Sequence, residues 1–375
     1  MKKVVIAIDS FKGCLPSAEA GKAAAEGIRS VYPECEVICL PIADGGEGML
    51  DVLIMATNGQ EVPISAHDPL MRWRNTYYGI SENGETAFIE MASISGLPLV
   101  PPEKRNPMLT TTYGTGEIIR DALERGCRNF IIGIGGSATN DAGLGMFQAL
   151  GFHFSDKEGK EVGTGRGEIL IKVAHIDSTF VHPALNSCRF TVACDVQNPF
   201  YGPEGAAYVF APQKGADREM VEALDAGLQN LAEVIRHTTG KDISHHPGAG
   251  AAGGMGGSLL AFLNAELKPG IQLMLEALDF SNKIKNADLI ITGEGKADRQ
   301  TLMGKVPSGI LAEARKQDIP VILLAGNIED SDELQQAGFE GVFSVNPPFI
   351  SLEEAMRPEV ARKNIQQTVE CICKK

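Results

Sequence analysis

The sequence predicts an α/β protein in which the two ends of the chain form a doubly wound parallel sheet and a second α/β domain is inserted between them. Residues 3–8 (KVVIAI) are a nearly continuous apolar run rich in β-branched residues, as in strands buried on both faces of a parallel sheet. A helical pattern at residues 17–29 and a second strand pattern at residues 36–41 complete a βαβ unit.

The C-terminal segment supplies the rest of this sheet. Strands are predicted at residues 288–292, 320–325 and 341–345, and helices at residues 308–316 and 352–372, the last one broken near Pro358. We therefore predict a discontinuous first domain made of residues 1–62 and 285–375.

The middle of the chain, residues 63–284, is predicted to be the inserted α/β domain. Asn83-Gly84 between two strand patterns is a hairpin signal. The strands are expected at residues 73–80, 86–91, 130–133 and 190–195, and the helices at residues 144–150, 220–236 and 259–263. The glycine-rich residues 248–257 are either a flexible loop or a loop that covers a ligand. Because the chain crosses twice between the domains, we expect the active site in the interdomain cleft.

The amino-acid composition indicates which kinds of binding partner to exclude and in which cellular compartment the protein works. The 375 residues carry 34 Lys and Arg against 48 Asp and Glu, a net charge of −14 that argues against nucleic acid and against a basic membrane-binding surface. Asp9 ends the first apolar run too early for a signal peptide, and no segment approaches the ~20 apolar residues of a membrane span. The eight cysteines form no CxxC pair and are expected to be reduced, so we predict a cytoplasmic protein.

Two polar clusters follow the first two predicted strands, where ligands gather in open α/β sheets. In DSFKG (residues 9–13), Asp9 can handle a metal or a hydroxyl proton and Lys12 can meet an anion; the alternative is a turn with Asp9 capping the next helix. In DGGEG (residues 44–48), glycines bracket Asp44 and Glu47, which suggests close approach to a ligand. The alternative there is an N-cap at Asp44 with Glu47 as its capping-box partner.

A third cluster, GIGGSATNDAGLG (residues 133–145), follows the strand expected at residues 130–133. Its glycine N–H groups and Ser137 can form an anion-binding nest at the start of a helix. The sequence is neither a Walker A motif nor GxGxxG, because no Gly-Lys-Ser/Thr follows and Ala138 stands at the third glycine position. Asn140 and Asp141 are also candidates to cap the following helix.

Two further clusters lie later in the chain. In DVQNP (residues 195–199), Asp195 is a candidate base or metal ligand, although Asn-Pro is also a common turn. TGEGKAD (residues 292–298) with the following GKVP (residues 304–307) offers two acids and two lysines around a glycine-rich loop. Carboxylates, lysines and glycine-rich loops without a redox or Ser-His-Asp motif suit phosphoryl transfer, which needs charge neutralisation, Mg²⁺ ligands and a proton acceptor.

The ordered motifs DSFKG, ADGGEG, GIGGSATNDAG, ACDVQNP with APQKGA, GAGAAGGMGG and ITGEGKAD…GKVPSGI resemble the glycerate kinase type 1 family over essentially the whole chain. The resemblance implies a Rossmann-like domain with an inserted α/β domain, and ATP- and Mg²⁺-dependent phosphorylation of D-glycerate, generally to 2-phosphoglycerate. It leaves a homodimer open, and it leaves glycerate 3-phosphorylation as an alternative outcome. A hydroxy-acid dehydrogenase and a non-catalytic sugar-acid sensor are the competing classes.

Motif matching gives each candidate residue a role. The expected catalytic residues are Asp195, nearest to a base role, with Lys12 and Asp9. The expected substrate- and phosphate-binding residues are Ser10, Gly135, Gly136, Ser137, Asn140, Asp141, Asn198 and Lys305. The expected metal ligands are Asp44, Glu47, Glu294 and Asp298.

Overall fold

The computed structural model describes residues 1–46 and 48–374, and by its internal contacts the chain divides into two compact units. The first unit is Met1–Asp44 with Ile271–Lys375, and the second is Gly45–Gly270. Residues 45–62 belong to the second unit because β3 (Gln60–His67) pairs with β4 (Trp73–Ile80), on which α2 (Met49–Ala56) also packs. Residues 271–284 belong to the first unit, where Ile271 packs against Gly309.

The first unit is a five-stranded parallel sheet in the order β13-β12-β11-β1-β2. Its strands are β1 (Lys3–Ile8), β2 (Glu36–Cys39), β11 (Leu289–Ala297), β12 (Val321–Ile328) and β13 (Gly341–Ser344). Numbered within this unit, the order is 2-1-3-4-5, a doubly wound arrangement that switches direction between β1 and β11. The α/β class and the five expected strands are confirmed.

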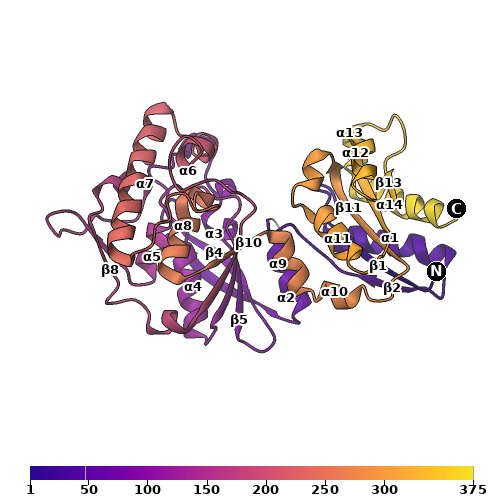
Figure 1. Cartoon of the computed structure of the whole chain (residues 1–375), viewed down its shortest axis with the longest axis horizontal. Helices are drawn as coiled ribbons and strands as arrows, with labels where there is room; N and C mark the ends of the chain where they lie inside the picture. The colour runs from indigo at the N-terminus through magenta and orange to yellow at the C-terminus, as the bar shows by residue number, and fades with distance from the viewer. Residues whose placement is uncertain (47, 375) are drawn as a thin grey trace. The chain divides into compact units, whose positions relative to one another are not determined.

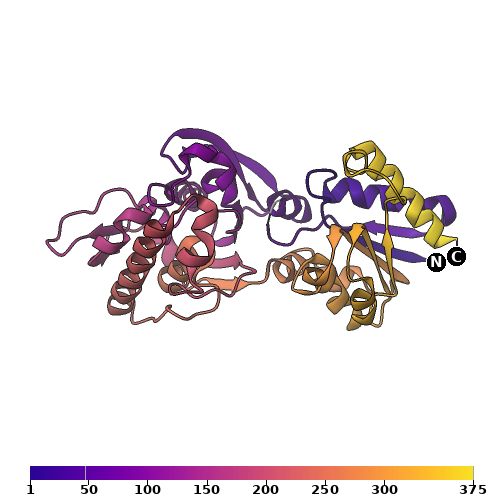
Figure 2. The same cartoon turned by 90° about the horizontal axis from the view of Figure 1, so that it is seen from above.

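Helices cover both faces of this sheet. In Figure 2 the indigo α1 (Ser17–Val31) and the yellow α14 (Pro358–Cys373) lie side by side on one face, and α11 (Val306–Arg315) lies on the other. The predicted break near Pro358 is confirmed, since α14 begins there after the separate turn α13 (Leu352–Ala355). The remaining helices are α9 (Gly270–Ala277), α10 (Phe280–Lys283), the 3₁₀ turn at Arg299–Leu302 and α12 (Ser331–Gln336).

The second unit is built on a six-stranded mixed sheet in the order β10-β9-β6-β5-β4-β3 (Figure 1). Strands β5 (Thr86–Glu90), β6 (Asn129–Gly133), β9 (Arg189–Ala193) and β10 (Glu266–Lys268) are parallel. The predicted hairpin is confirmed, because β4 and β5 are antiparallel around the turn that holds Gly84. The sequence analysis missed β3, although it pairs with β4 along its whole length.

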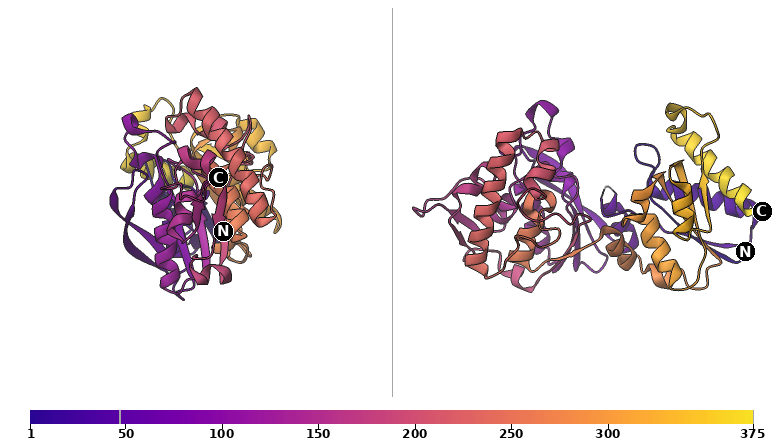
Figure 3. Two further views of the ribbon diagram at one scale, coloured as in Figure 1. Left: turned by 90° about the vertical axis from the view of Figure 1, so that its left-hand side faces the viewer. Right: turned by 45° about the horizontal axis from the view of Figure 1, so that its top comes forward.

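Helices of the second unit pack around one large core. The main helices are α4 (Tyr113–Glu124), α5 (Leu144–Ala149), α7 (Arg218–Thr239) and α8 (Ala251–Leu263). The long salmon helix α7 lies beside α6 (Ala206–Phe210) and α8 in Figure 1 and is seen from another side in Figure 3. The short elements are α3 (Ala92–Ser95), β7 (His153–Ser155), β8 (His175–Asp177) and the 3₁₀ turns at Leu97–Leu99, Pro102–Lys104, Gly167–Lys172, Pro183–Ser187 and Pro212–Lys214.

The start of α8 corrects the expectation for residues 248–257. The element starts at Ala251, but Ala252, Gly253 and Gly254 have left-handed backbone angles. The regular helix therefore begins at Met255, four positions before the predicted Leu259. One of them, Gly253, lies so close to the preceding loop that an added Cβ would be 2.3 Å from Thr139 O. Gly253 and Gly254 therefore form a tightly packed left-handed turn directly before the regular helix. No helix of the described chain has the length and apolar character needed to cross a bilayer.

Candidate active site

The first unit has a cavity of about 320 Å³ at the switch point of its sheet. The end of β1 continues alongside β11, because Asp9 N donates a hydrogen bond to Gly293 O at 2.9 Å, and this places Asp9 next to Glu294. Of the predicted site residues, Asp9, Ser10, Lys12, Asp44, Glu294 and Lys305 all line this cavity. The structure thus brings together residues that lie almost 300 positions apart in the sequence.

Asp9 lies in an environment that disfavours its charge. Its side chain is 7% exposed, and burial together with the neighbouring Asp44 raises its pKa to about 7. The Ser10 N–H, which donates to Asp9 Oδ1 at 2.7 Å, and Lys12 oppose this rise, whereas Glu294 adds to it. A carboxyl group with this pKa changes protonation state near neutral pH, as a general base or acid requires.

Glu294 is the second buried carboxylate of the cavity. Burial raises its pKa, while Thr301 and Lys305 oppose the rise, and Lys305 Nζ lies 3.4 Å from Oε2. The other oxygen, Oε1, is buried and has no hydrogen-bond partner among the described residues. A buried carboxylate oxygen without a partner is unfavourable by itself, so the group fits a cation or a hydroxyl donor supplied by a ligand.

The helix-capping alternatives for the first two motifs are wrong. The N-cap of α1 is Pro16 and the N-cap of α2 is Gly48, so neither Asp9 nor Asp44 caps its following helix. Glu47, the expected capping partner and metal ligand, lies outside the described residues.

Asp298 does not line the cavity and has partners of its own. It caps the 3₁₀ turn Arg299–Leu302, accepting from Gln300 N at 2.9 Å, and its carboxylate lies 3.4 Å from Lys296 Nζ. Desolvation opposes the shift, but the Gln300 N–H and Lys296 hold the pKa of Asp298 below its ordinary value. No group of three or more His, Cys, Asp and Glu side chains in the described chain is arranged to hold a metal ion. Mg²⁺ commonly uses only one or two carboxylates together with substrate phosphates.

In the second unit, the loop after β6 carries the buried carboxylate of Asp141. Its two oxygens accept from Thr112 N and Oγ1, both at 2.8 Å, from Gly143 N at 3.1 Å and from Gly145 N at 3.3 Å. The last two N–H groups lie at the start of α5, whose N-cap residue is Gly143. Neither Asn140 nor Asp141 is therefore the N-cap that the sequence suggested, although the Asp141 carboxylate binds these two N–H groups. Burial raises the pKa of Asp141, whereas the four donors favour its ionised form.

Lys214 is a functional candidate that the sequence analysis missed. Its ammonium group is buried and donates to Ser137 Oγ at 2.7 Å and to Thr139 O at 2.6 Å. Burial lowers its pKa to about 7, and Asp141 opposes the shift. The sequence signal for it is the motif APQKGA at residues 211–216, whose lysine is Lys214.

Asn140, between Thr139 and Asp141 in this loop, is fully buried. Neither its amide oxygen nor its amide nitrogen has a hydrogen-bond partner among the described residues. Gly135 and Gly136, the glycines predicted to bind phosphate, are exposed at the end of β6. The loop therefore combines exposed backbone groups with a buried polar interior.

Asp195 and Asn198 follow β9 in the second unit. Asp195 is exposed, and its Oδ1 accepts a hydrogen bond from Gly270 N at 2.9 Å. Asn198 Nδ2 donates to Glu204 O at 2.8 Å, and the turn that the Asn-Pro pair suggested is not observed at residues 194–199. The predicted residues thus form two groups, one around the cavity of the first unit and one on loops of the second.

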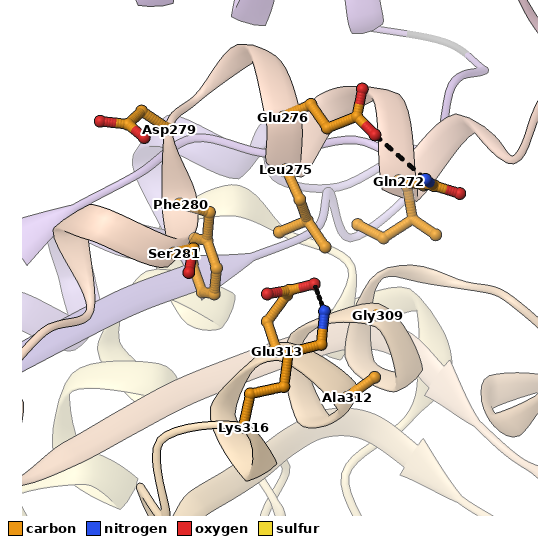
Figure 4. Close-up of a pocket in the computed structure, with 11 residues that line it drawn as sticks. Gln272, Leu275, Glu276, Asp279, Phe280, Ser281, Gly309, Ala312, Glu313 and Lys316 are labelled. Carbon is orange, nitrogen blue, oxygen red and sulfur yellow. Dashed lines mark hydrogen bonds and ion pairs between the residues drawn. The ribbon is translucent and has the colours of Figure 1, made fainter.

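A larger hollow of about 530 Å³ lies in the first unit between α9, α10 and α11 (Figure 4). Its polar groups pair with each other: Lys316 Nζ lies 2.5 Å from Glu313 Oε1, and Gln272 Nε2 donates to Glu276 Oε1 at 3.0 Å. None of the described residues predicted as site residues lines it. The smaller cavity at the switch point, which is lined by the residues predicted from the sequence, is therefore the candidate active site.

Comparison with known proteins agrees with the sequence motifs. A model of the glycerate kinase family matches residues 4–375. The chain is 48% identical to the glycerate 2-kinase of Escherichia coli (strain K12), covering 95% of this chain and 93% of that one. It is 47% identical to the glycerate kinase of Bacillus subtilis (strain 168), covering 94% and 92%. A crystal structure that carries the name glycerate kinase 2, from Salmonella typhimurium LT2, matches with a TM-score of 0.90 at 43% identity, covering 100% of this chain and 97% of that one.

Proposed function

The chain belongs to the glycerate kinase family, and we propose that it transfers the γ-phosphoryl group of ATP to the 2-hydroxyl of D-glycerate, giving 2-phosphoglycerate and ADP. The observation that carries this proposal is the cavity at the switch point of the first unit, which combines Asp9, Glu294 and Lys305. Phosphoryl transfer needs the same three kinds of group: a proton acceptor, a ligand for the metal and a cation for the phosphates.

Asp44 and Glu294 are the proposed Mg²⁺ ligands in the described part of the chain. The unpartnered Oε1 of Glu294 and the carboxylate of Asp44 in the same cavity are hard oxygen donors, which Mg²⁺ prefers. When bound, Mg²⁺ offsets charge that develops on the phosphate oxygens. Glu47 and Asp298 remain predictions as ligands.

We propose Asp9 as the group that takes the proton of the substrate hydroxyl. With a pKa of about 7 it is matched to proton transfer at neutral pH. As the bond from the γ-phosphorus to the bridging oxygen of ADP breaks and the bond to the glycerate oxygen forms, the hydroxyl proton passes to the carboxylate. Asp195 remains the alternative base that the motif order predicts.

The remaining proposed groups, two lysines of the first unit and several loop residues of the second, bind phosphate and substrate. Lys12 and Lys305 offset negative charge on phosphate or on the glycerate carboxylate. Ser10 is a proposed hydroxyl donor to phosphate. The proposed substrate- and phosphate-binding groups of the second unit are Gly135, Gly136, Ser137, Asn140 and Asn198. For Asp141 we propose the indirect role of holding the loop, because its carboxylate already accepts four hydrogen bonds from the chain.

A coupled assay tests the reaction and the position of transfer together. Protein, Mg-ATP and D-glycerate are mixed with enolase, and phosphoglycerate mutase is left out. Enolase dehydrates only the 2-phosphate, so we expect an absorbance rise from phosphoenolpyruvate. ADP release without this rise would move the phosphate to the 3-hydroxyl. Binding of glycerate without ADP release would favour a sensor, and a change in nicotinamide absorbance would favour a dehydrogenase.

Lys305→Met tests the charge at the phosphate. The variant loses the cation beside Glu294, so we expect kcat/KM for ATP to fall by about 10- to 100-fold. Lys305→Arg should retain more of the activity, and Lys22→Met, at an exposed lysine on α1, serves as the control. Unchanged kcat and KM in Lys305→Met would refute the role.

We further propose that the protein works in the cytoplasm, because all eight cysteines, which lie within the described residues, are free thiols. A homodimer stays a prediction that sedimentation analysis would test.

A further inference from the structure

The charged residues proposed for catalysis form only part of the lining of the switch-point cavity. The rest of the lining includes five apolar side chains, those of Phe11, Cys14, Leu352, Ala355 and Met356. It is completed by Gly295, Lys296, Gly326, Asn327 and Asn346. Phe11 and Ala355 are buried, but Leu352 is 75% exposed and Met356 is 39% exposed. Exposed apolar side chains beside a polar cavity are typical of a ligand-binding surface, since a ligand's flat apolar face can cover them.

The apolar residues are held by packing between two segments of the first unit. A Cβ on Gly13 would lie 3.3 Å from Met356 Cε, and Cys14 Sγ is 3.9 Å from Ala355 O. A Cβ on Gly326 would lie 2.7 Å from Gly295 O and 3.6 Å from the Phe11 ring. The absence of a side chain at Gly326 therefore keeps this part of the cavity open beside Phe11.

Asn346 adds one amide whose orientation is fixed. Its Nδ2 donates to Gly326 O at 2.8 Å, and its Oδ1 accepts from Asn364 Nδ2 at 3.3 Å. Turning the amide over would place its oxygen against Gly326 O and its nitrogen against the Asn364 amide. One Nδ2 hydrogen and one lone pair of Oδ1 have no partner in the described chain, and Asn346 lines the cavity.

An unused donor beside an unused acceptor on one amide matches adenine. Asparagine can bind the adenine amino group through its oxygen and the adjacent ring nitrogen through its NH₂ group. Guanine presents a carbonyl oxygen in place of that amino group, and the fixed Oδ1 of Asn346 would repel it. Aromatic bases also cover apolar side chains effectively.

We infer that the switch-point cavity binds the adenine nucleotide, with the base against Leu352 and Met356 and its amino edge on the Asn346 amide. The inference rests on the proposed function, which requires ATP. It assigns the phosphates to the side of Lys12 and Lys305, because these cations line the same cavity. Asn346 is then the residue that sets the preference for adenine over guanine.

Calorimetric titration of the full-length protein with ADP and with GDP, both in the presence of Mg²⁺, tests the inference. We expect wild-type protein to bind ADP about 5- to 100-fold more tightly than GDP, and Asn346→Ala to lose most of this preference. Leu352→Ser should weaken both nucleotides by about 3- to 10-fold and leave KM for D-glycerate unchanged. The matched controls are Asn282→Ala on the exposed side of α10 and Ile171→Ser, an exposed apolar residue of the second unit.

Leu352→Ser keeps the test decisive if Asn346→Ala does not fold, because the Leu352 side chain is exposed and supports little of the core. If the wild-type protein forms 2-phosphoglycerate but both variants bind ADP as the wild type does, the nucleotide lies elsewhere and the inference is overturned. Equal wild-type affinity for ADP and GDP would overturn the role of Asn346. A wild-type protein that neither binds ADP nor phosphorylates glycerate would instead overturn the proposed function.

Discussion

Replacing Asp9 by Asn is expected to lower kcat by about 10²- to 10⁴-fold and, at the same time, to stabilise the ligand-free protein at mildly alkaline pH. Activity falls because asparagine cannot accept the proton of the substrate hydroxyl. The side chains are nearly the same size, so the shape of the cavity is retained. In the wild type we expect kcat/KM to rise with pH through about 7, the pKa of Asp9 in the ligand-free protein.

The gain in stability follows from the same pKa. The folded-state pKa of about 7 lies above the ordinary value of 3.8, so the folded protein keeps this proton over a pH range where the unfolded chain has released it. The free energy of unfolding therefore decreases as pH rises from about 4 to about 7. Between about pH 5 and pH 8 the advantage of Asp9→Asn should grow by about 2–3 kcal/mol, measured by urea unfolding without nucleotide or Mg²⁺.

A control variant and a comparison variant test whether these effects come from Asp9 itself rather than from loss of an aspartate elsewhere. Asp332→Asn, at an exposed position on α12, should change neither kcat nor the pH dependence of stability. Asp195→Asn distinguishes the two candidate bases. If Asp195→Asn loses activity by two or more orders of magnitude and Asp9→Asn does not, the motif-based expectation is right and Asp9 is not the proton acceptor.

Replacing Lys214 by Met is expected to change how stability depends on pH. The folded-state pKa of Lys214 is lowered to about 7 from 10.5, so between these values the unfolded chain holds a proton that the folded protein has released. Wild-type stability should therefore rise relative to that of Lys214→Met by about 4 kcal/mol between about pH 7 and pH 10. The lost hydrogen bonds to Ser137 and Thr139 add a cost that does not depend on pH in the same way.

Urea unfolding of both proteins at the two pH values measures this difference, with Lys172→Met at an exposed position as control. A difference that stays constant with pH would mean that Asp141 and the two acceptors keep Lys214 charged in the folded protein. In that case the pair would act as a buried ion pair that holds the loop after β6.

The sequence allowed the first sheet to be predicted well because its strands are buried on both faces. KVVIAI at residues 3–8 and PVILLA at residues 320–325 are apolar without interruption, and such runs have few alternatives. Strand β3 was missed because its burial alternates irregularly and it contains Pro63, which disfavours a strand assignment. The three-residue strands β7, β8 and β10 are too short for any periodicity to appear.

Site residues could be predicted from the sequence where a carboxylate lies at or directly after the end of a recognisable strand. Asp9 and Glu294 stand at or after the ends of β1 and β11, so topology alone brings them together. Lys214 and Asn346 were not predictable in the same way. A lysine is usually exposed, and only the three-dimensional structure buries Lys214 against Thr139 O. The orientation of Asn346 depends on Asn364, which belongs to another element of the fold.

The pairing of β1 with β11 has a consequence for how the protein is made. The two strands touch at Thr292 Oγ1 and Ala7 O, 285 residues apart in the sequence. At a synthesis rate of about 5–20 residues per second, β1 leaves the ribosome roughly 15–60 s before its central partner. The continuous second unit can fold during that interval, while the apolar residues of β1 have only β2 to pair with. The apolar side chains of β1 therefore lack their central partner strand during that interval, and the cavity with Asp9 is completed only after β11 has been synthesised.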